Sequence, residues 1–336
     1  MILYATKLRA FAILAVLLIH ISTPLVRQEV GSFEWWVGNV VDGSMRWAVP
    51  IFIMLSGMLL LGRGESQLNV VKKRVPRLLI PLLFWSLLYS LWDIRYDLET
   101  FSVQQILTDF YQNDVKYHLW YLYTLLGLYL AMPLFKTFIQ HGRKSDLLYF
   151  ILLDYIISAT FEVLSSLLDI RLGNGFGYFL GYGGYFLLGY YLANTSLNKK
   201  TTNLIHLLGS AALLVTIIGT WFFSAEQGSL NQVFYKYLSL TTPIVSVSVF
   251  LLIKDLWNTE NSRLTTVIAN YSFGIYLIHP MILDVLRGEE FIQLTGISDV
   301  TTHPMIYVTF MFIVVLTFSI LSTFILSKIP LLKKFV

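Results

Sequence analysis

The sequence predicts an all-α integral membrane protein, and three observations lead to that fold class. Of its 336 residues, 56% are apolar and only 13% are charged, whereas an ordinary soluble domain is about one quarter charged. The apolar residues come in runs that approach the roughly 20 residues a helix needs to cross the hydrocarbon core. The runs also lack the two-residue alternation of an outer-membrane barrel. We therefore predict a bundle of about ten transmembrane helices that forms one domain over residues 1–336.

Short charged stretches separate the predicted spans. The first three spans are short, so snorkelling Lys and Arg side chains or local thinning of the bilayer must make up the length. The longest connections lie near 27–46, 95–117 and 285–303, and none is long enough for a separate soluble domain. A cleaved signal peptide is not expected, because no small-residue cleavage site follows the first apolar run. The predicted spans are residues 8–26, 47–62, 78–94, 118–137, 147–168, 178–195, 203–223, 237–253, 265–284 and 304–327.

The distribution of Lys and Arg predicts the side on which each connection lies. With a cytoplasmic N-terminus, 17 of the 24 Lys and Arg residues fall on cytoplasmic connections and 7 on outer ones, as the positive-inside rule requires. An even number of spans then places the C-terminus in the cytoplasm as well. The formal net charge of +4 therefore reflects topology, and we predict no nucleic-acid binding. The outer residues are Arg27, Arg46, Arg95, Lys116, Arg171, Lys236 and Arg287.

Several kinds of chemistry are excluded by what the sequence lacks. There is no cysteine, so acyl-cysteine intermediates, disulfides, iron–sulfur clusters and cysteine–zinc sites are ruled out. The six histidines are scattered without an HxxxH pair, and we predict no metal site. No Walker loop, GxGxxG fingerprint or clear internal repeat is present.

His20 is the first candidate for chemistry within a span. It follows Arg9 by eleven residues, close to three helical turns, so the two side chains share one helix face roughly 16 Å apart along the axis. Pro24 removes the usual helical N–H partner of the His20 carbonyl, which predicts a kink. A histidine at a kinked, hydrated point is placed to move a proton. The alternative is a polar side chain that hydrogen-bonds between helices.

Arg74 and Arg77 lie at the predicted cytoplasmic start of the third span. They are three residues apart and share a face if a helix begins there. Guanidinium groups suit phosphate, because each can bond two phosphate oxygens at once. The alternative is that they only obey the positive-inside rule or contact anionic lipid.

Further polar groups lie in later spans. His118, Trp120 and Tyr121 open the fourth span, where Trp and Tyr are usual interface anchors but also can stack on sugar rings. Glu162 lies in the middle of the fifth span and His279 in the outer third of the ninth, and ionisable groups at such positions are functional candidates. We predict catalytic roles for these two residues beside the first-span histidine, and substrate binding by the three that open the fourth span.

Ser56 and Gly57 lie deep in the second apolar run. Small residues there let two helix backbones approach closely. Ser56 could also be a nucleophile, but no base lies near it in the sequence, so we predict a packing contact.

Together these motifs resemble the integral-membrane acyltransferase-3 family, in the family's order and over essentially the whole chain. The branch that contains the enterobacterial common antigen O-acetyltransferase is the most similar, on Arg46-Trp-Ala-Val-Pro and His118-Leu-Trp-Tyr-Leu-Tyr. The motifs are Arg9-x10-His20, Phe52 to Gly57 ending in Leu-Ser-Gly, Arg74-x-x-Arg77 leading into Pro81, His118-Leu-Trp-Tyr, Phe186-Leu-Leu-Gly-Tyr and Phe273-Gly-Ile-Tyr-Leu-Ile-His279-Pro280.

The resemblance implies transfer of an acyl group, usually acetyl from acetyl-CoA, to a hydroxyl of a cell-envelope glycan or its lipid-linked precursor. It implies catalysis by His20, donor binding by Arg9, Arg74 and Arg77, and a place in the bacterial plasma membrane. Expected partners are acyl-CoA, the glycan acceptor and membrane lipids. We expect no appended extracellular esterase-like domain, so the bundle delivers acyl groups directly to the acceptor or to a separate protein.

The implied mechanism agrees with the spacing of the first motif. The CoA phosphates would stay at the inner face, while the pantetheine arm, comparable in length to the Arg9–His20 spacing, brings the thioester to His20. A neutral His20 would then take the proton from a sugar hydroxyl. A covalent acyl-histidine or acyl-serine step is the competing mechanism.

A transporter or flippase is the main alternative from another functional class. Intramembrane His and Glu and proline-broken helices would also suit a proton-coupled carrier, and some relatives of this fold are associated with amino-acid uptake. The lack of a repeat and the phosphate-like basic pair favour the transferase. A non-catalytic partner in polysaccharide export is a third possibility.

Overall fold

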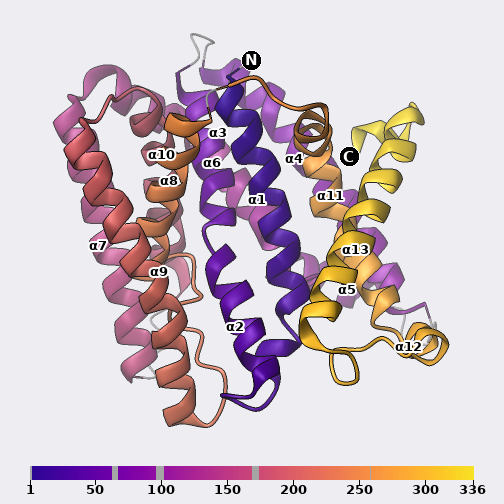
Figure 1. Ribbon diagram of the computed structural model, residues 1–336. Helices are drawn as coiled ribbons and strands as arrows, with labels where there is room; N and C mark the ends of the chain where they lie inside the picture. The colour runs from indigo at the N-terminus through magenta and orange to yellow at the C-terminus, as the bar shows by residue number, and fades with distance from the viewer. Residues whose placement is uncertain (1, 63–66, 96–101, 169–173, 258) are drawn as a thin grey trace.

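The computed structural model describes residues 2–62, 67–95, 102–168, 174–257 and 259–336. These residues form a bundle of helices without a strand among them (Figure 1), which confirms the all-α prediction. The helices are α1 (Leu3–Ser22), η1 (Leu25–Arg27), α2 (Phe33–Met45), α3 (Ala48–Leu61), α4 (Gln67–Asp93), α5 (Val103–Gln112), α6 (Trp120–His141), α7 (Lys144–Leu168), α8 (Asn174–Ala193), α9 (Lys199–Gln227), α10 (Thr242–Leu256), α11 (Arg263–Leu286), α12 (Glu289–Thr295), α13 (Pro304–Lys328) and η3 (Leu332–Lys334), where η marks a 3-10 helix.

Eight segments in the described part of the chain are long and apolar enough to cross a membrane. The other two predicted spans correspond to α8 and α10, which do not meet this criterion. α10 has only 15 residues, short of the roughly 20 that a span needs, and α8 is rich in Gly and Tyr. The eight segments are Leu3–Arg27, Phe33–Leu61, Val71–Asp93, Trp120–His141, Lys144–Ser165, Lys199–Gln227, Arg263–Leu286 and Pro304–Lys328.

The stretch near 27–46 is not the outer loop that we predicted. α2 occupies most of it and joins α3 in one apolar segment, Phe33–Leu61. The Ser32 side chain caps α2 by accepting a hydrogen bond from the Trp35 N–H at 3.1 Å, as N-cap serines do. The prediction failed because the polar residues of this stretch resemble those of a loop, whereas several of them are satisfied inside the protein.

α3 and α8 cross at close range. A Cβ atom on Gly57 would collide with the carbonyl oxygen of Phe186, and one on Gly189 would collide with that of Met54. The Ser56 hydroxyl donates to its own helix, to the Phe52 carbonyl at 3.0 Å. The close helix contact predicted in the second span is therefore confirmed at Gly57.

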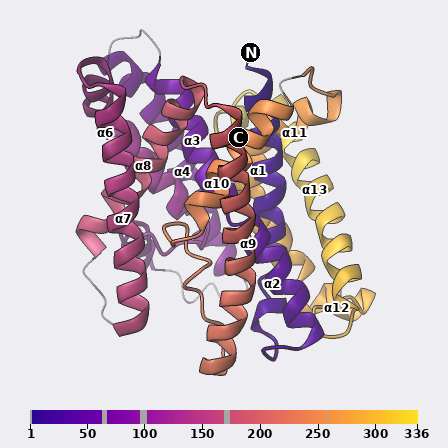
Figure 2. The same cartoon turned by 60° about the vertical axis from the view of Figure 1, so that its left-hand side comes forward.

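α1 occupies the interior of the bundle and carries the first candidate residue near its end. It packs against α2, α3, α11 and α13, and it lies between α7 and α13 in both views (Figures 1 and 2). Both chain ends lie toward the upper side of Figure 1, the relation that an even number of spans requires. Which side is cytoplasmic stays a prediction, and two of the residues behind it, Arg63 and Arg171, lie outside the described ranges.

Candidate active site

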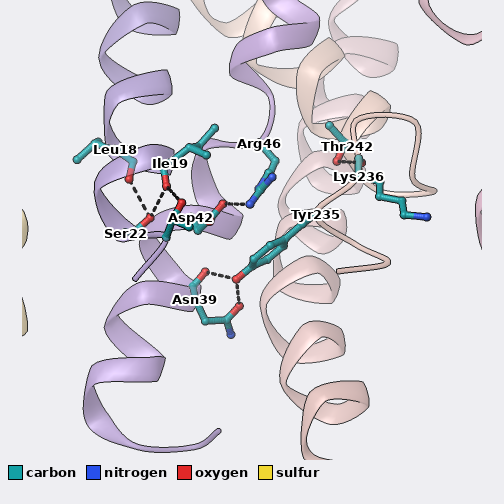
Figure 3. Close-up of polar contacts among 10 residues, drawn as sticks. Leu18, Ile19, Ser22, Asn39, Asp42, Arg46, Tyr235, Lys236 and Thr242 are labelled. Atoms are coloured by element: carbon teal, nitrogen blue, oxygen red, sulfur yellow. Dashed lines mark hydrogen bonds and ion pairs between the residues drawn. The ribbon is translucent and has the colours of Figure 1, made fainter. Parts of the chain in front are cut away.

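The C-terminal end of α1 positions His20. The helix ends two residues later, so the carbonyls of its last turn have no helical N–H partner. The Ser22 hydroxyl donates to the Ile19 carbonyl at 3.1 Å (Figure 3). The Arg287 guanidinium donates to the His20 carbonyl at 2.7 Å and to that of Ile21 at 3.3 Å. The last turn of α1 is thus held by side chains, one of them from α11's end.

Pro24 explains why α1 needs an outside donor. The predicted kink is absent; the helix instead ends, and the chain turns into η1. The prediction that the His20 carbonyl lacks a helical partner is confirmed, because proline has no N–H to give it. Arg287 supplies the missing donor, and a cation beside a helix C-terminus also interacts favourably with the helix dipole.

Three histidines from distant parts of the chain meet at this point. The rings of His20 and His279 are stacked with centroids 5.1 Å apart, and the ring of His118 lies 5.6 Å from that of His279. The ring of Tyr117 packs on the ring of His20, with the two centroids 4.8 Å apart. Two residues predicted as catalytic and one predicted to bind substrate are therefore neighbours.

The hydrogen bonds of His279 fix its tautomer. Its Nδ1 lies 2.8 Å from the carbonyl oxygen of Tyr276 and 3.1 Å from that of Ile275. A carbonyl only accepts, so Nδ1 carries a proton, and in the neutral ring Nε2 presents a lone pair. Pro280 makes this possible, because it has no N–H to give to the Tyr276 carbonyl. Nε2 is buried without a hydrogen-bond partner among the described residues, as an unused base would be.

A cavity of about 250 Å³, here called the histidine cavity, connects the two ends of the first motif. Arg9 and His20 both line it, with His118 beside the latter. This confirms that Arg9 and His20 share one face of α1. Ser56 and Asn270 also line the cavity, and the sequence reasoning missed Asn270, an exposed amide in an otherwise apolar stretch of α11.

The other two predicted donor-binding arginines differ in their surroundings. Arg74 is half-buried, and its Nε is buried without a hydrogen-bond partner in the described part of the chain. Tyr129, which lines the histidine cavity, lies within electrostatic range of both Arg9 and Arg74. Arg77 is exposed and does not line this cavity. The structure thus brings Arg9 and Arg74 together around Tyr129.

A second cavity of about 650 Å³, here called the aromatic cavity, adjoins the first. Trp120 and Tyr237 line both cavities, and their rings are stacked with centroids 5.5 Å apart. Tyr121, which follows Trp120, lines only the histidine cavity. The three residues that open the predicted fourth span therefore all line the histidine cavity, and Trp120 also lines the aromatic cavity.

Glu162 is not brought together with the histidines. It lines the aromatic cavity, where its carboxylate forms an ion pair with the Lys236 ammonium at 2.6 Å. The structure therefore separates this residue from His20 and His279, beside which we predicted it.

A polar network beside the aromatic cavity was missed by the sequence reasoning. The Arg46 guanidinium pairs with the buried Asp42 carboxylate at 2.5 Å and lies 4.3 Å from the centroid of the Tyr235 ring. The Tyr235 hydroxyl donates to the Asn39 side-chain oxygen at 2.6 Å (Figure 3). Arg46 also lies within electrostatic range of His20. The i, i+4 spacing of Asp42 and Arg46 was the one sequence signal for this network.

Comparison with known proteins identifies the family. The acyltransferase-3 model, described as an acyltransferase domain, matches residues 4–324, which is nearly the whole chain. No curated protein and no solved structure matches, and the enterobacterial common antigen branch stays a prediction. The match extends from the start of α1 to near the end of α13, so it includes every residue that lines either cavity. The chain therefore belongs to the acyltransferase-3 family and is a multi-pass membrane acyltransferase.

Proposed function

We propose that this acyltransferase moves an acetyl group from cytoplasmic acetyl-CoA to a hydroxyl of a cell-envelope polysaccharide or its lipid-linked precursor, in the bacterial plasma membrane. The observation that carries the proposal is that one cavity is lined by Arg9 at one end and by His20 at the other. A phosphate-binding cation and a proton acceptor are therefore available to the two ends of one extended donor.

The cation end of the cavity suits the anionic end of coenzyme A. Arg9 lines it, Arg74 stands nearby with an unused buried Nε, and the Asn270 amide adds a donor and an acceptor. Arginine is well matched to phosphate, since its fork can bond two oxygens of one phosphate. The nucleotide would stay at this end while the narrower pantetheine arm enters the cavity.

The histidine end suits proton transfer during acyl transfer. A nitrogen of His20 takes the proton of the acceptor hydroxyl as its oxygen attacks the thioester carbonyl. The new carbon–oxygen bond forms, the carbon–sulfur bond breaks, and the proton passes from His20 to the departing thiolate. The Nδ1 proton of His279 is held by a backbone carbonyl, and its ring is stacked on that of His20, which limits the positions that the His20 ring can take.

Replacing His20 with Gln tests the proposal. Gln keeps a polar side chain at the end of α1 but cannot accept and release a proton, so glycan O-acetylation per folded protein should fall by about 10²–10⁴. Acetyl-CoA affinity should be unchanged, because Arg9 and Arg74 hold the other end of the donor. His206→Gln is the matched control, since His206 lies within α9 and hydrogen-bonds the Ser248 hydroxyl at 3.0 Å, away from both cavities.

A purely structural role for His20 predicts a different result. A histidine that only hydrogen-bonds between helices contributes about 0.6 kcal/mol on average, so its loss would lower protein abundance and leave turnover per molecule normal. Wild-type turnover in folded His20→Gln would overturn the catalytic assignment. Acyl-CoA binding without any transfer in the wild-type protein would point instead to a carrier.

A further inference from the structure

The aromatic cavity has no role in the proton-transfer step, although it is the larger of the two. Its volume is about 650 Å³, against about 250 Å³ for the histidine cavity. The two share the stacked pair Trp120 and Tyr237 as a common wall. A molecule in the aromatic cavity would therefore adjoin the histidine cavity without occupying the donor's place.

The shared wall offers flat aromatic surface. The Trp120 ring also packs against Tyr182, with centroids 5.6 Å apart, so three aromatic rings from α6, α8 and the segment before α10 meet here. Rigid aromatic faces with a polar edge bind amphipathic ligands at low entropic cost. A sugar ring, with a C–H face and hydroxyls around its rim, is such a ligand.

Two unused polar atoms beside the cavity complement a hydroxyl group. Asn113 lines it, and its Oδ1 is buried without a hydrogen-bond partner in the described residues. Arg46 lines it as well, and its Nε is likewise buried and unpartnered. One atom accepts and the other donates, and a hydroxyl can do both. Asn113 is held in place as the left-handed C-cap of α5, with φ 60°.

The charges around the cavity are balanced. Arg46 pairs with Asp42 at 2.5 Å and Lys236 pairs with Glu162 at 2.6 Å. An anionic ligand would have to compete with a carboxylate already in place, and separating a partly buried pair is costly. A neutral ligand leaves both pairs intact.

We propose that the aromatic cavity binds a neutral sugar residue of the acceptor, stacked on Trp120, with one hydroxyl directed across the shared wall toward His20. The proposal rests on the proposed function, because it gives the acceptor of that reaction a site and a charge class. It also gives Glu162 a role: holding Lys236 so that the cavity carries no net charge.

Asn113→Gly is the sharpest variant. Glycine adopts the left-handed conformation freely, so the C-cap of α5 is kept and only the side-chain amide is lost. The assay measures acetyl-CoA consumption above acceptor-free hydrolysis, with methyl hexosides and matched methyl hexuronides as acceptors. We expect neutral glycosides to be used in preference to uronides. We also expect Asn113→Gly and Trp120→Leu each to raise the acceptor KM by about tenfold or more. Asn113 lines the aromatic cavity and not the histidine cavity, so Asn113→Gly should leave the acetyl-CoA affinity unchanged.

The control is Asn194→Gly, which removes an exposed amide at the end of α8 and should leave the acceptor KM unchanged. Unchanged acceptor KM in Asn113→Gly and Trp120→Leu, or a preference for uronides, would overturn the proposal while leaving the acetyl transfer itself standing. A weaker acetyl-CoA affinity in Asn113→Gly would overturn it too, by assigning the aromatic cavity to the donor. Absence of any acetyl transfer in the wild-type protein would instead refute the proposed function.

Discussion

Replacing Arg287 with Met should slow acyl transfer more than it weakens the fold, because the guanidinium holds the end of α1. It donates to the His20 carbonyl at 2.7 Å, to the Ile21 carbonyl at 3.3 Å and, through Nε, to the Tyr307 hydroxyl at 3.4 Å. Met keeps most of the side chain's volume and removes all three bonds. The His20 carbonyl is then left without this donor, and Pro24 has no N–H to replace it.

The expected loss of stability follows from these distances. A hydrogen bond from a charged group contributes about 1.5–3 kcal/mol, and polar contacts inside membrane proteins average about 0.6 kcal/mol. One short and two long bonds therefore amount to about 1–3 kcal/mol. The effect on turnover is expected to be larger, because displacing a catalytic group by about 1 Å can cost 10²-fold in rate.

The assay separates positioning from stability. Turnover per folded molecule should fall about 10–100-fold in Arg287→Met, with acetyl-CoA affinity unchanged. Arg287→Lys should recover part of it, because an ammonium can serve the His20 carbonyl but lacks the fork that reaches both carbonyls. Arg27→Met, at an exposed arginine of the neighbouring η1, is the matched control and should behave as wild type.

A double-mutant cycle provides the refutation. If Arg287 acts through His20, the change to Met should cause no further loss of turnover in the His20→Gln background. Normal turnover in folded Arg287→Met, or full additivity with His20→Gln, would refute the positioning role and leave Arg287 as a structural cap.

The remaining predictions concern topology, donor binding and packing. A reporter in the connection between α3 and α4 should be cytoplasmic and one between α4 and α5 external; opposite labelling would reverse the assignment of sides. Arg74→Ala should weaken acetyl-CoA binding, measured by calorimetry, more than Arg77→Ala does, because of the two only Arg74 is partly buried beside the histidine cavity. If both variants bind acetyl-CoA with wild-type affinity, the two arginines serve only to set the membrane topology. Gly57→Ala should lower the free energy of unfolding, measured by thermal unfolding in detergent, by about 1–3 kcal/mol, because its Cβ atom clashes with α8. Gly127→Ala should leave this free energy unchanged, because Gly127 has open space around it.

The fold class and most spans could be predicted from the sequence because both depend on local patterns. Apolar runs of spanning length report a membrane helix directly, and the Arg9–His20 spacing reports a shared face. The structure differs from the prediction at α2, α8 and α10, where length or polarity departs from the simple rule. α2 carries buried polar groups such as Asn39 and Asp42, and their partners lie far along the chain.

The site was predictable only in part, for the same reason. His20, His118 and His279 were each identified as unusual residues in or beside spans, but nothing local indicates that their rings meet. Part of the role of Arg287 could be predicted, because Pro24 showed that the His20 carbonyl needs a hydrogen-bond donor. The identity of the donor could not, because it lies 267 positions away in the sequence. A proline therefore predicts an unpaired carbonyl at a helix end, while the residue that donates a hydrogen bond to this carbonyl depends on the tertiary fold.

Glu162 shows the limit of the rule that an ionisable residue inside a span is functional. The rule holds because burying an unpaired charge is costly, so such a residue is kept only where it has a function. An ion pair lowers that cost, so a paired residue needs no catalytic role to explain its position. Its partner Lys236 lies in the segment before α10, which is neither a regular helix nor a charged loop in the sequence pattern. The sequence therefore indicates that a carboxylate at position 162 must have a reason to lie inside a span. The ion pair with Lys236 at 2.6 Å is such a reason, and it requires no part in proton transfer. Because the same pair lines the aromatic cavity, its effect on function is through the charge seen by a ligand there.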